Sequence, residues 1–334
     1  MNFAKDLFGY IGKYRSALMG FSMIAVFMFH AHSAKLGFQP TGFVGAFCSY
    51  GYLGVDIFLF LSAYGLCFSL KRNDLKHFFC NRFIRIMPTW WVILFLVHIA
   101  GLVVGSKIPT NNFVYPHTFV DMFYWYTGLG FIFNTCHYEW YIPTLLIFYL
   151  LIPLIYRLSR IHIMLIIALF IPAIALYTES EILQHLSLLI NRIPVFILGA
   201  LFFKESEHNN YNRFLIFCFS IFIYTCIFNF FFNVPIPLRL SSSFPILIGL
   251  LSYILSLKYI SFIEVFLSFV GSCSLELYLI HLYRRPQFLL SLFIKNAEMQ
   301  VLGSFILCLI LSYLLHKFIK IFNEKYLSRI VCHT

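Results

Sequence analysis

The stretch SMIAVFMFHAHS, residues 22–33, guides the interpretation of the chain, because a long apolar run carries two histidines near its end. With the residues before it, the run is long enough to enter a bilayer. A titratable side chain at membrane depth costs about 2.5–3.5 kcal/mol, so His30 is expected to face a protein interior or a water-filled cavity rather than lipid. His30 is therefore the first candidate functional residue.

The composition places the rest of the chain in a membrane as well. The 334 residues are 61% hydrophobic and 11% charged, whereas soluble domains carry about 45–50% apolar and about 25% charged residues. In a soluble protein the net charge of +11 would indicate a nucleic-acid partner. Here the basic residues fall where the positive-inside rule puts them, so no nucleic acid is expected and the predicted partner is the lipid bilayer.

Spans of about 20 mostly apolar residues predict an all-α, polytopic membrane protein with about ten transmembrane helices. They fall at 16–34, 51–70, 87–106, 139–156, 162–178, 187–204, 212–232, 241–257, 262–282 and 299–320. The apolar stretch 122–135 is short and contains Gly128 and Gly130, so a partly inserted loop or an interfacial segment is expected. Most Lys and Arg residues lie on one side if both termini are cytoplasmic. We expect 1–334 to form a single transmembrane domain without a separate soluble domain.

Several polar residues then collect near the outer ends of the predicted helices. His30 lies in the outer part of its predicted helix, and Asp56 lies one or two turns into the next helix from the outside. A single polar residue at a helix end is often explained by snorkelling to water. His30 and Asp56 lie too deep for that explanation and should face the interior of the bundle. The other members of this group are Glu139, Arg192, Glu276 and His281.

A basic motif marks the inner side of the predicted bundle. Residues 71–91 read KRNDLKHFFCNRFIRIMPTWW. Arg82 and Arg85 are three residues apart, so they share one face of a helix. Two guanidinium groups on one face suit a phosphate group. One explanation of these arginines is the ordinary excess of positive charge on the cytoplasmic side. The more specific hypothesis is that they bind a phosphate-bearing ligand from the cytoplasm.

Six motifs, in order along nearly the whole chain, resemble acyltransferase family 3, a family of integral membrane enzymes. They are IAVFMFHAHS at 24–33, GYLGVDIFLFLSAYGL at 51–66, RFIR at 82–85, EWYIPTLLIFYLLIPLI at 139–155, NRIPVFILGALF at 191–202 and SLELYLIH at 274–281. Many members carry an Arg eleven residues before the histidine of the first helix. Met19 stands there in this chain, and the nearest basic residue is Arg15, about one helical turn earlier.

The resemblance implies an O-acyltransferase that moves an acyl group, most often acetyl, from cytoplasmic acyl-CoA to a hydroxyl of an extracytoplasmic glycan or sugar. It implies His30 as the general base, and Arg82 and Arg85 as ligands for the phosphates of acetyl-CoA. Arg15 is a candidate for the same anion. From its depth alone, Asp56 is a candidate to orient the imidazole of His30, as a carboxylate does in a catalytic triad.

The acceptor is expected to meet side chains near the outer surface. Trp140 and Tyr141 could stack on a sugar face, with an interfacial aromatic belt as the alternative. Glu139, Arg192 and His281 complete the predicted acceptor-binding set. No metal is expected, because no H-E-x-x-H pattern is present and histidines two residues apart point to different helix faces. The predicted location is the inner (plasma) membrane.

Two other functions compete with this prediction. A proton-coupled small-molecule transporter would also use intramembrane His and Asp residues, but such proteins usually have two similar halves. Here the charged motifs concentrate in residues 15–85, which favours the enzyme. A polysaccharide polymerase or ligase would need a larger outer loop than 107–138. The specificity for the acceptor is expected to lie in short outer loops such as 35–50, 107–138 and 283–298.

Overall fold

The computed structural model describes residues 3–33, 38–104, 118–133, 140–158, 162–163, 165–166, 186–232, 241, 243–282 and 290–327. Every regular element among these residues is a helix, which confirms the all-α prediction. The chain divides into two compact units. The first unit is Met1–Ser22, Leu53–Asn73 and Trp140–Gly271, and the second is Met23–Tyr52, Asp74–Glu139 and Ser272–Thr334.

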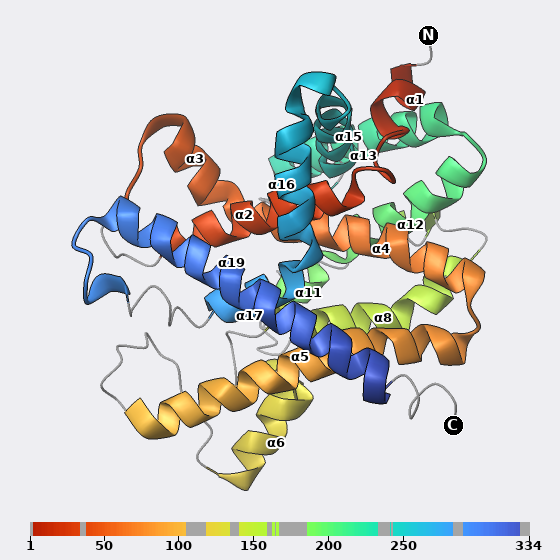
Figure 1. The fold of residues 1–334 in the computed structure, drawn as a ribbon. Coiled ribbons are helices and arrows are strands. Elements are labelled where there is room, and N and C mark those ends of the chain that lie inside the picture. The colour runs from red at the N-terminus through yellow and green to blue at the C-terminus, as the bar shows by residue number, and fades with distance from the viewer. Residues whose placement is uncertain are drawn as a thin grey trace. The chain divides into compact units, whose positions relative to one another are not determined.

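The first unit is built mainly from the middle of the chain (Figure 1). It also takes in the beginning of α2 (Arg15–Ser33). Its helices are α1 (Phe3–Phe8), α4 (Gly54–Arg72), α8 (Tyr141–Arg157), α11 (Ser187–Ile190), α12 (Ile193–Glu207), α13 (Tyr211–Phe232), α15 (Phe244–Leu255), the 3-10 turn η3 (Lys258–Ile260) and α16 (Ser261–Ser272).

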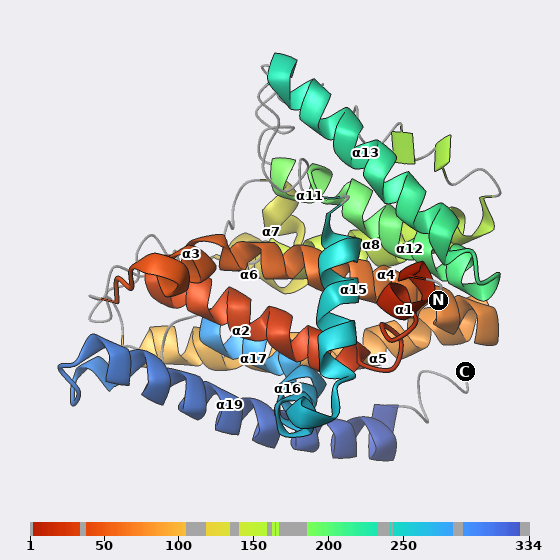
Figure 2. The ribbon, with the colours of Figure 1, turned by 90° about the horizontal axis from the view of Figure 1, so that it is seen from above.

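Close helix packing forms the core of the first unit. A Cβ at Gly199 of α12 would collide with the carbonyl oxygen of Phe60 of α4, so these two backbones approach closely. Small residues permit such approach between membrane helices, where burial of apolar surface drives association weakly. The rings of Phe148 and Phe196 stack with centroids 4.3 Å apart and join α8 to α12. On the other side of α12 lies α13, as Figure 2 shows.

The second unit contains the remaining helices. It takes in most of α2 and the short helix α3 (Gly42–Tyr50), which continues into the 3-10 turn η1 (Gly51–Leu53). The others are α5 (Leu75–Val104), α6 (Phe119–Thr127), α7 (Leu129–Ile132), α17 (Ser274–Leu282), α19 (Ala297–Phe322) and the π-helical turn η4 (Asn323–Leu327). In this unit α17 and α5 both pack against α19.

A proline inside α5 explains one of the contacts between α5 and the end of α19. Pro88 has no N–H, so the carbonyl of Ile84, four residues earlier, loses its usual helical hydrogen bond. The side chain of Asn323 donates to that carbonyl at 2.9 Å. A distant amide therefore satisfies the backbone group that the proline leaves unpaired.

The described residues contain six helices that are long and apolar enough to cross a membrane, and a bent pair that would make a seventh. The six are Arg15–Ser33, Gly42–Arg72, Leu75–Ala100, Ser187–Glu207, Tyr211–Phe231 and Ala297–Lys325. The bent pair consists of Phe244–Leu255 and Lys258–Ser272, at 87° to each other. The protein is thus a multi-pass membrane protein. The count of ten and the cytoplasmic termini stay predictions, and most of the predicted helix 162–178 lies outside the described residues.

Two stretches differ in detail from what hydropathy suggests. The predicted helix 262–282 is two helices, because α16 ends at Ser272 and α17 begins at Ser274. The aromatic stretch 122–135 contains α6 and α7, which meet at Gly128. The backbone of Gly128 has φ 75°, a left-handed conformation that glycine adopts without strain. The glycine thus ends α6 and begins α7.

Candidate active site

The second unit brings two of the predicted site residues into direct contact. His30 lies near the end of α2 and is half-buried, and His281 lies in the last turn of α17 and is 5% exposed. Their rings form a hydrogen bond of 2.7 Å between Nδ1 of His30 and Nε2 of His281. The two residues are 251 positions apart in sequence. They are called the histidine pair below.

Hydrogen bonding sets the tautomers of the histidine pair. Nδ1 of His281 lies 2.8 Å from the carbonyl oxygen of Leu277, one turn earlier on α17. A carbonyl oxygen only accepts, so Nδ1 of His281 carries the proton and donates it. With both rings neutral, Nε2 of His281 is then the acceptor and Nδ1 of His30 the donor. The lone pair of His30 therefore lies on Nε2, which is the nitrogen that can take up a proton.

The surroundings of the histidine pair are aromatic and hold both rings in place. The ring of Phe27 lies 5.7 Å from His281 and that of Phe29 lies 5.4 Å from His30, centroid to centroid. The ring of Tyr278 lies 5.6 Å from His281. Such packing restricts rotation of both imidazoles, which a catalytic base requires.

A hydrogen bond between α17 and α19 anchors the helix that carries His281. Oε1 of Glu276 lies 3.0 Å from Nδ1 of His316. Glu276 is 5% exposed, and its Oε2 has no hydrogen-bond partner among the described residues. Sequence reasoning grouped Glu276 with the outer polar residues but missed His316. No local pattern links two side chains on separate helices.

In the first unit, Asp56 pairs with Arg192. Oδ1 of Asp56 lies 3.5 Å from Nε of Arg192, and the two side chains are 0% and 4% exposed. Within the described part of the chain, neither oxygen of Asp56 accepts a hydrogen bond. Arg192 also donates from Nη1 to the carbonyl of Leu188 at 2.9 Å. The carboxylate of Asp56 therefore depends on the guanidinium for its compensation, since a lone buried charge is very costly.

The predicted aromatic residues lie beside this ion pair. The guanidinium carbon of Arg192 stands 4.7 Å from the ring centroid of Trp140, within cation–π distance. Trp140 is half-buried and Tyr141 is 7% exposed. Trp140 and Tyr141 contact each other edge to face at 6.0 Å. Asp56, Arg192 and Trp140 thus form one cluster, whereas Glu139 lies outside the described residues.

Arg82 and Arg85 both lie on α5, three residues apart, before Pro88. Arg82 is half-buried with its guanidinium 5.5 Å from the ring centroid of Phe78, and Arg85 is exposed. Residues three apart on a helix share a face. Arg82 thus packs against an aromatic ring of the preceding turn, while Arg85 extends to the surface.

Arg15 starts α2 and lies across α4. Its Nε donates to the carbonyl of Leu61 at 3.0 Å. A Cβ at Gly65 would come within 2.8 Å of the guanidinium, so the glycine leaves the space that the guanidinium fills. Met19 stands where many members of the family carry an Arg. In this chain Arg15, four residues earlier, is anchored against the backbone of α4.

Comparison with known proteins agrees with this arrangement of motifs. A family model described as an acyltransferase domain matches residues 17–320. No curated protein and no solved structure is similar enough to the chain to count as a match. The matched segment begins two residues after the start of α2 and ends two residues before the end of α19. It includes the histidine pair, the Asp56–Arg192 pair and both arginines of α5. The chain belongs to acyltransferase family 3.

Proposed function

We propose that this membrane acyltransferase moves an acetyl group from cytoplasmic acetyl-CoA to a hydroxyl of an extracytoplasmic carbohydrate at the inner membrane. The proposal rests on two hydrogen bonds, one from His281 to the carbonyl of Leu277 and one from His30 to His281. Together they put the lone pair of His30 on its Nε2. Imidazole is the side chain most often used as a general base near neutral pH.

His30 acts as the general base in this proposal. Its Nε2 takes the proton of the acceptor hydroxyl while the hydroxyl oxygen attacks the carbonyl carbon of the thioester. A C–O bond forms and the C–S bond breaks. The thiolate of coenzyme A then takes the proton back from His30, so the reaction needs no further proton source. The balance of the reaction is one ester and one thiol from one thioester and one alcohol.

His281 orients and polarises His30. In place of the acceptor-binding role predicted from its position, we assign it the role that a carboxylate has in a Ser-His-Asp triad. It accepts from Nδ1–H of the base and holds one tautomer. As His30 becomes an imidazolium, the hydrogen bond to His281 becomes charge-assisted and stronger. Asp56 as the orienting carboxylate stays a prediction.

The donor is held through its phosphates. Arg82 and Arg85 suit this role because they share one face of α5. Arg15 is the third candidate. Along α2, Arg15 and His30 are separated by roughly 22 Å, at about 1.5 Å per residue. An extended pantetheine arm has a comparable reach, so the nucleotide could stay at the cytoplasmic surface while the thioester reaches His30.

The acceptor is a carbohydrate in this proposal. Trp140 offers an aromatic face and lies beside a guanidinium, a combination that can bind a sugar ring by stacking and hydrogen bonding. Tyr141 is its neighbour on α8. Arg192 and Glu139 complete the proposed acceptor site, and Arg192 is at the same time the counter-ion of Asp56.

Variants of the histidine pair test the catalytic part of the proposal. Membranes carrying the full chain are supplied with acetyl-labelled acetyl-CoA, and label in the glycan fraction is measured. His30→Ala should lower transfer by 10²-fold or more, a typical value for a general base. His281→Phe should lower the maximal rate, and His281→Gln should restore part of it, because the Gln oxygen can accept from Nδ1–H of His30.

A control and a refuting result complete this experiment. His32 lies two residues beyond His30 on α2, where its ring nitrogen Nε2 contacts Ser49 at 3.4 Å, and His32→Gln should transfer at the wild-type rate. Normal transfer by His30→Ala would remove the mechanism. Equal loss in His281→Gln and His281→Phe would remove the proposed orienting role of His281.

Binding of acetyl-CoA to the detergent-solubilised protein tests the donor site. Arg82→Ala and Arg85→Ala should each weaken binding, while Arg157→Ala, which removes an exposed arginine from α8, should not. No binding of acetyl-CoA by the wild type would favour a transport function over acyl transfer.

A further inference from the structure

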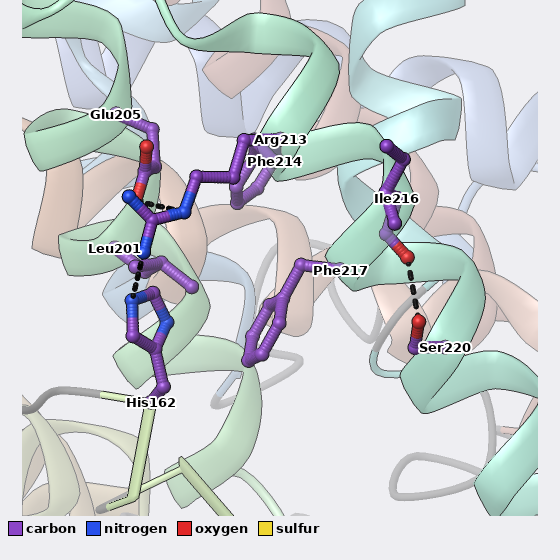
Figure 3. Close-up of a pocket in the computed structure, with 8 residues that line it drawn as sticks. All are labelled: His162, Leu201, Glu205, Arg213, Phe214, Ile216, Phe217 and Ser220. Carbon is purple, nitrogen blue, oxygen red and sulfur yellow. Dashed lines mark hydrogen bonds and ion pairs between the residues drawn. The ribbon is translucent and has the colours of Figure 1, made fainter.

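A pocket in the first unit lies apart from every residue assigned above. It has a volume of about 200 Å³ and lies between the end of α12, the beginning of α13 and His162 (Figure 3). Three titratable side chains face one another in it: Glu205 from α12, Arg213 from α13 and His162. Its apolar lining includes Leu201 and Phe217. The pocket thus combines charged groups with an apolar wall in a membrane protein.

The charged groups are only partly satisfied by one another. Nε of Arg213 lies 3.8 Å from Oε1 of Glu205, an ion pair without a hydrogen bond, and Nη2 of Arg213 lies 3.3 Å from Nε2 of His162. Glu205 is 6% exposed, and no described residue donates a hydrogen bond to its carboxylate. Nδ1 of His162 is buried and has no partner among the described residues. Because an arginine only donates, Nε2 of His162 is the acceptor of that bond and Nδ1 carries the proton. The pocket therefore has spare capacity to accept hydrogen bonds at Glu205 and to donate one from Nδ1 of His162.

One face of α13 leads from these charges into the apolar part of the protein. Arg213, Ile216, Phe217 and Ser220 line the pocket at intervals of three, four and seven residues, which places them on one face of the helix. The charged end lies at the polar turn between α12 and α13, which are parts of two helical segments that are each long and apolar enough to cross a membrane. A lipid headgroup is therefore expected at this end of both segments. Ile216 is 67% exposed, so the pocket opens onto a surface that contacts lipid chains in a membrane.

We infer that this pocket binds a phospholipid whose headgroup carries a primary ammonium, as phosphatidylethanolamine does. The ammonium donates to Glu205, which is nearly buried and accepts no hydrogen bond from a described residue. The phosphate accepts from Arg213, which has five N–H groups and is 65% exposed. An acyl chain follows Ile216 and Phe217. Since one water needs about 10–15 Å³ of such a cavity, a volume of about 200 Å³ has room for the ethanolamine end of a headgroup.

The charges and the free acceptor of Glu205 together favour a zwitterionic headgroup with a primary ammonium over other headgroups. An anionic headgroup without an ammonium would lie next to the carboxylate of Glu205 and leave it without a donor. A choline headgroup has the charge but no N–H, so it would also leave the carboxylate without a hydrogen bond. The inference does not depend on acyl transfer, because none of its residues takes part in the proposed chemistry.

The test is native mass spectrometry of the full-length protein with phosphatidylethanolamine, phosphatidylcholine and phosphatidylglycerol of equal chain length. The wild type should retain phosphatidylethanolamine about tenfold more than either other lipid. Glu205→Gln, a change of nearly equal size, should abolish this preference. Arg213→Gln should weaken retention of all three lipids.

A matched control is Glu207→Gln, which removes a carboxylate two residues further along α12 that is ion-paired with Lys71 and lies outside the pocket. It should retain the wild-type preference, and circular dichroism should show the same helix content in all three variants. Equal retention of the three lipids by the wild type would overturn the inference. An equal loss of the preference for phosphatidylethanolamine in Glu205→Gln and Glu207→Gln would also overturn it. Complete displacement of the bound lipid by ethanolamine phosphate would indicate a soluble ligand and would overturn it as well.

Discussion

Replacing Arg192 by glutamine removes the cation that the structure places against the buried carboxylate of Asp56. At the observed separation of 3.5 Å and an effective dielectric constant of about 20, two unit charges attract by about 5 kcal/mol. Desolvation of both groups offsets much of this attraction in the intact pair. Loss of one partner leaves the other buried and uncompensated, which typically costs about 3–5 kcal/mol.

We therefore expect Arg192→Gln to lower the free energy of unfolding by about 3–5 kcal/mol. The double variant Asp56→Asn, Arg192→Gln should recover at least half of that loss, because it removes both charges. Asp56→Asn alone should also destabilise the protein, since it leaves the guanidinium without its counter-ion. Arg157→Gln, which changes an exposed arginine of α8 in the same unit, should stay within about 0.5 kcal/mol of wild type.

The measurement is reversible unfolding in mixed micelles, followed by circular dichroism as the fraction of denaturing detergent rises. The wild type, the two single variants at Asp56 and Arg192 and the double variant form a double-mutant cycle, whose coupling energy is the quantity of interest. Acyl transfer is measured on the same samples at a temperature where all of them are folded.

Two results would refute this reasoning. Additive losses, with the double variant less stable than either single variant, would mean that Asp56 and Arg192 do not interact. Unchanged stability of Arg192→Gln together with lost transfer would make Arg192 a binding group for the acceptor instead of the counter-ion of Asp56.

Three further predictions concern other parts of the fold. Asn323→Leu removes the side-chain donor to the carbonyl of Ile84. It should lower the free energy of unfolding by about 1–3 kcal/mol in the same assay. An unchanged free energy of unfolding would mean that Asn323 does not compensate for Pro88. Gly65→Ala places a methyl group against the guanidinium of Arg15. It should weaken acetyl-CoA binding, as Arg15→Gln should. Unchanged affinity for acetyl-CoA in calorimetry would mean that Arg15 does not bind the donor. Asp74 lies just before the start of α5. The backbone N–H of His77 and, to a smaller extent, the ring of His77 form hydrogen bonds to its carboxylate, and these bonds hold the pKa of Asp74 below its ordinary value. The charged cap therefore stabilises the helix start above about pH 4 and is lost as the pH falls through the lowered pKa. Amide exchange in the first turn should speed up in acid, and Asp74→Asn should abolish that dependence.

The sequence was sufficient for those features that depend on neighbouring residues. The periodicity of a helix places Arg82 and Arg85 on one face of α5 without any tertiary information. Hydropathy locates α2, α4 and α19 because each crossing requires a long apolar run. It does not report a helix break, and the continuous apolar stretch 262–282 gave no indication that α16 and α17 are separate helices.

The chemistry of the site was only half predictable. Residue types and motif order singled out His30, His281, Asp56 and Arg192, but not which of them touch. The structure pairs His30 with His281 and Asp56 with Arg192, across 251 and 136 residues. The tautomer of His30 follows from the carbonyl of Leu277, a backbone group that a motif search does not consider.

The sequence by itself therefore determined that the chain lies in a membrane, that it is helical, and which side chains are too polar to face lipid. Those properties follow from the transfer free energies of single residues and from the local geometry of a helix. Only the tertiary structure decided which buried groups compensate one another. A hydrogen bond or ion pair between helices depends on how the intervening chain folds, and that is a property of the whole packing.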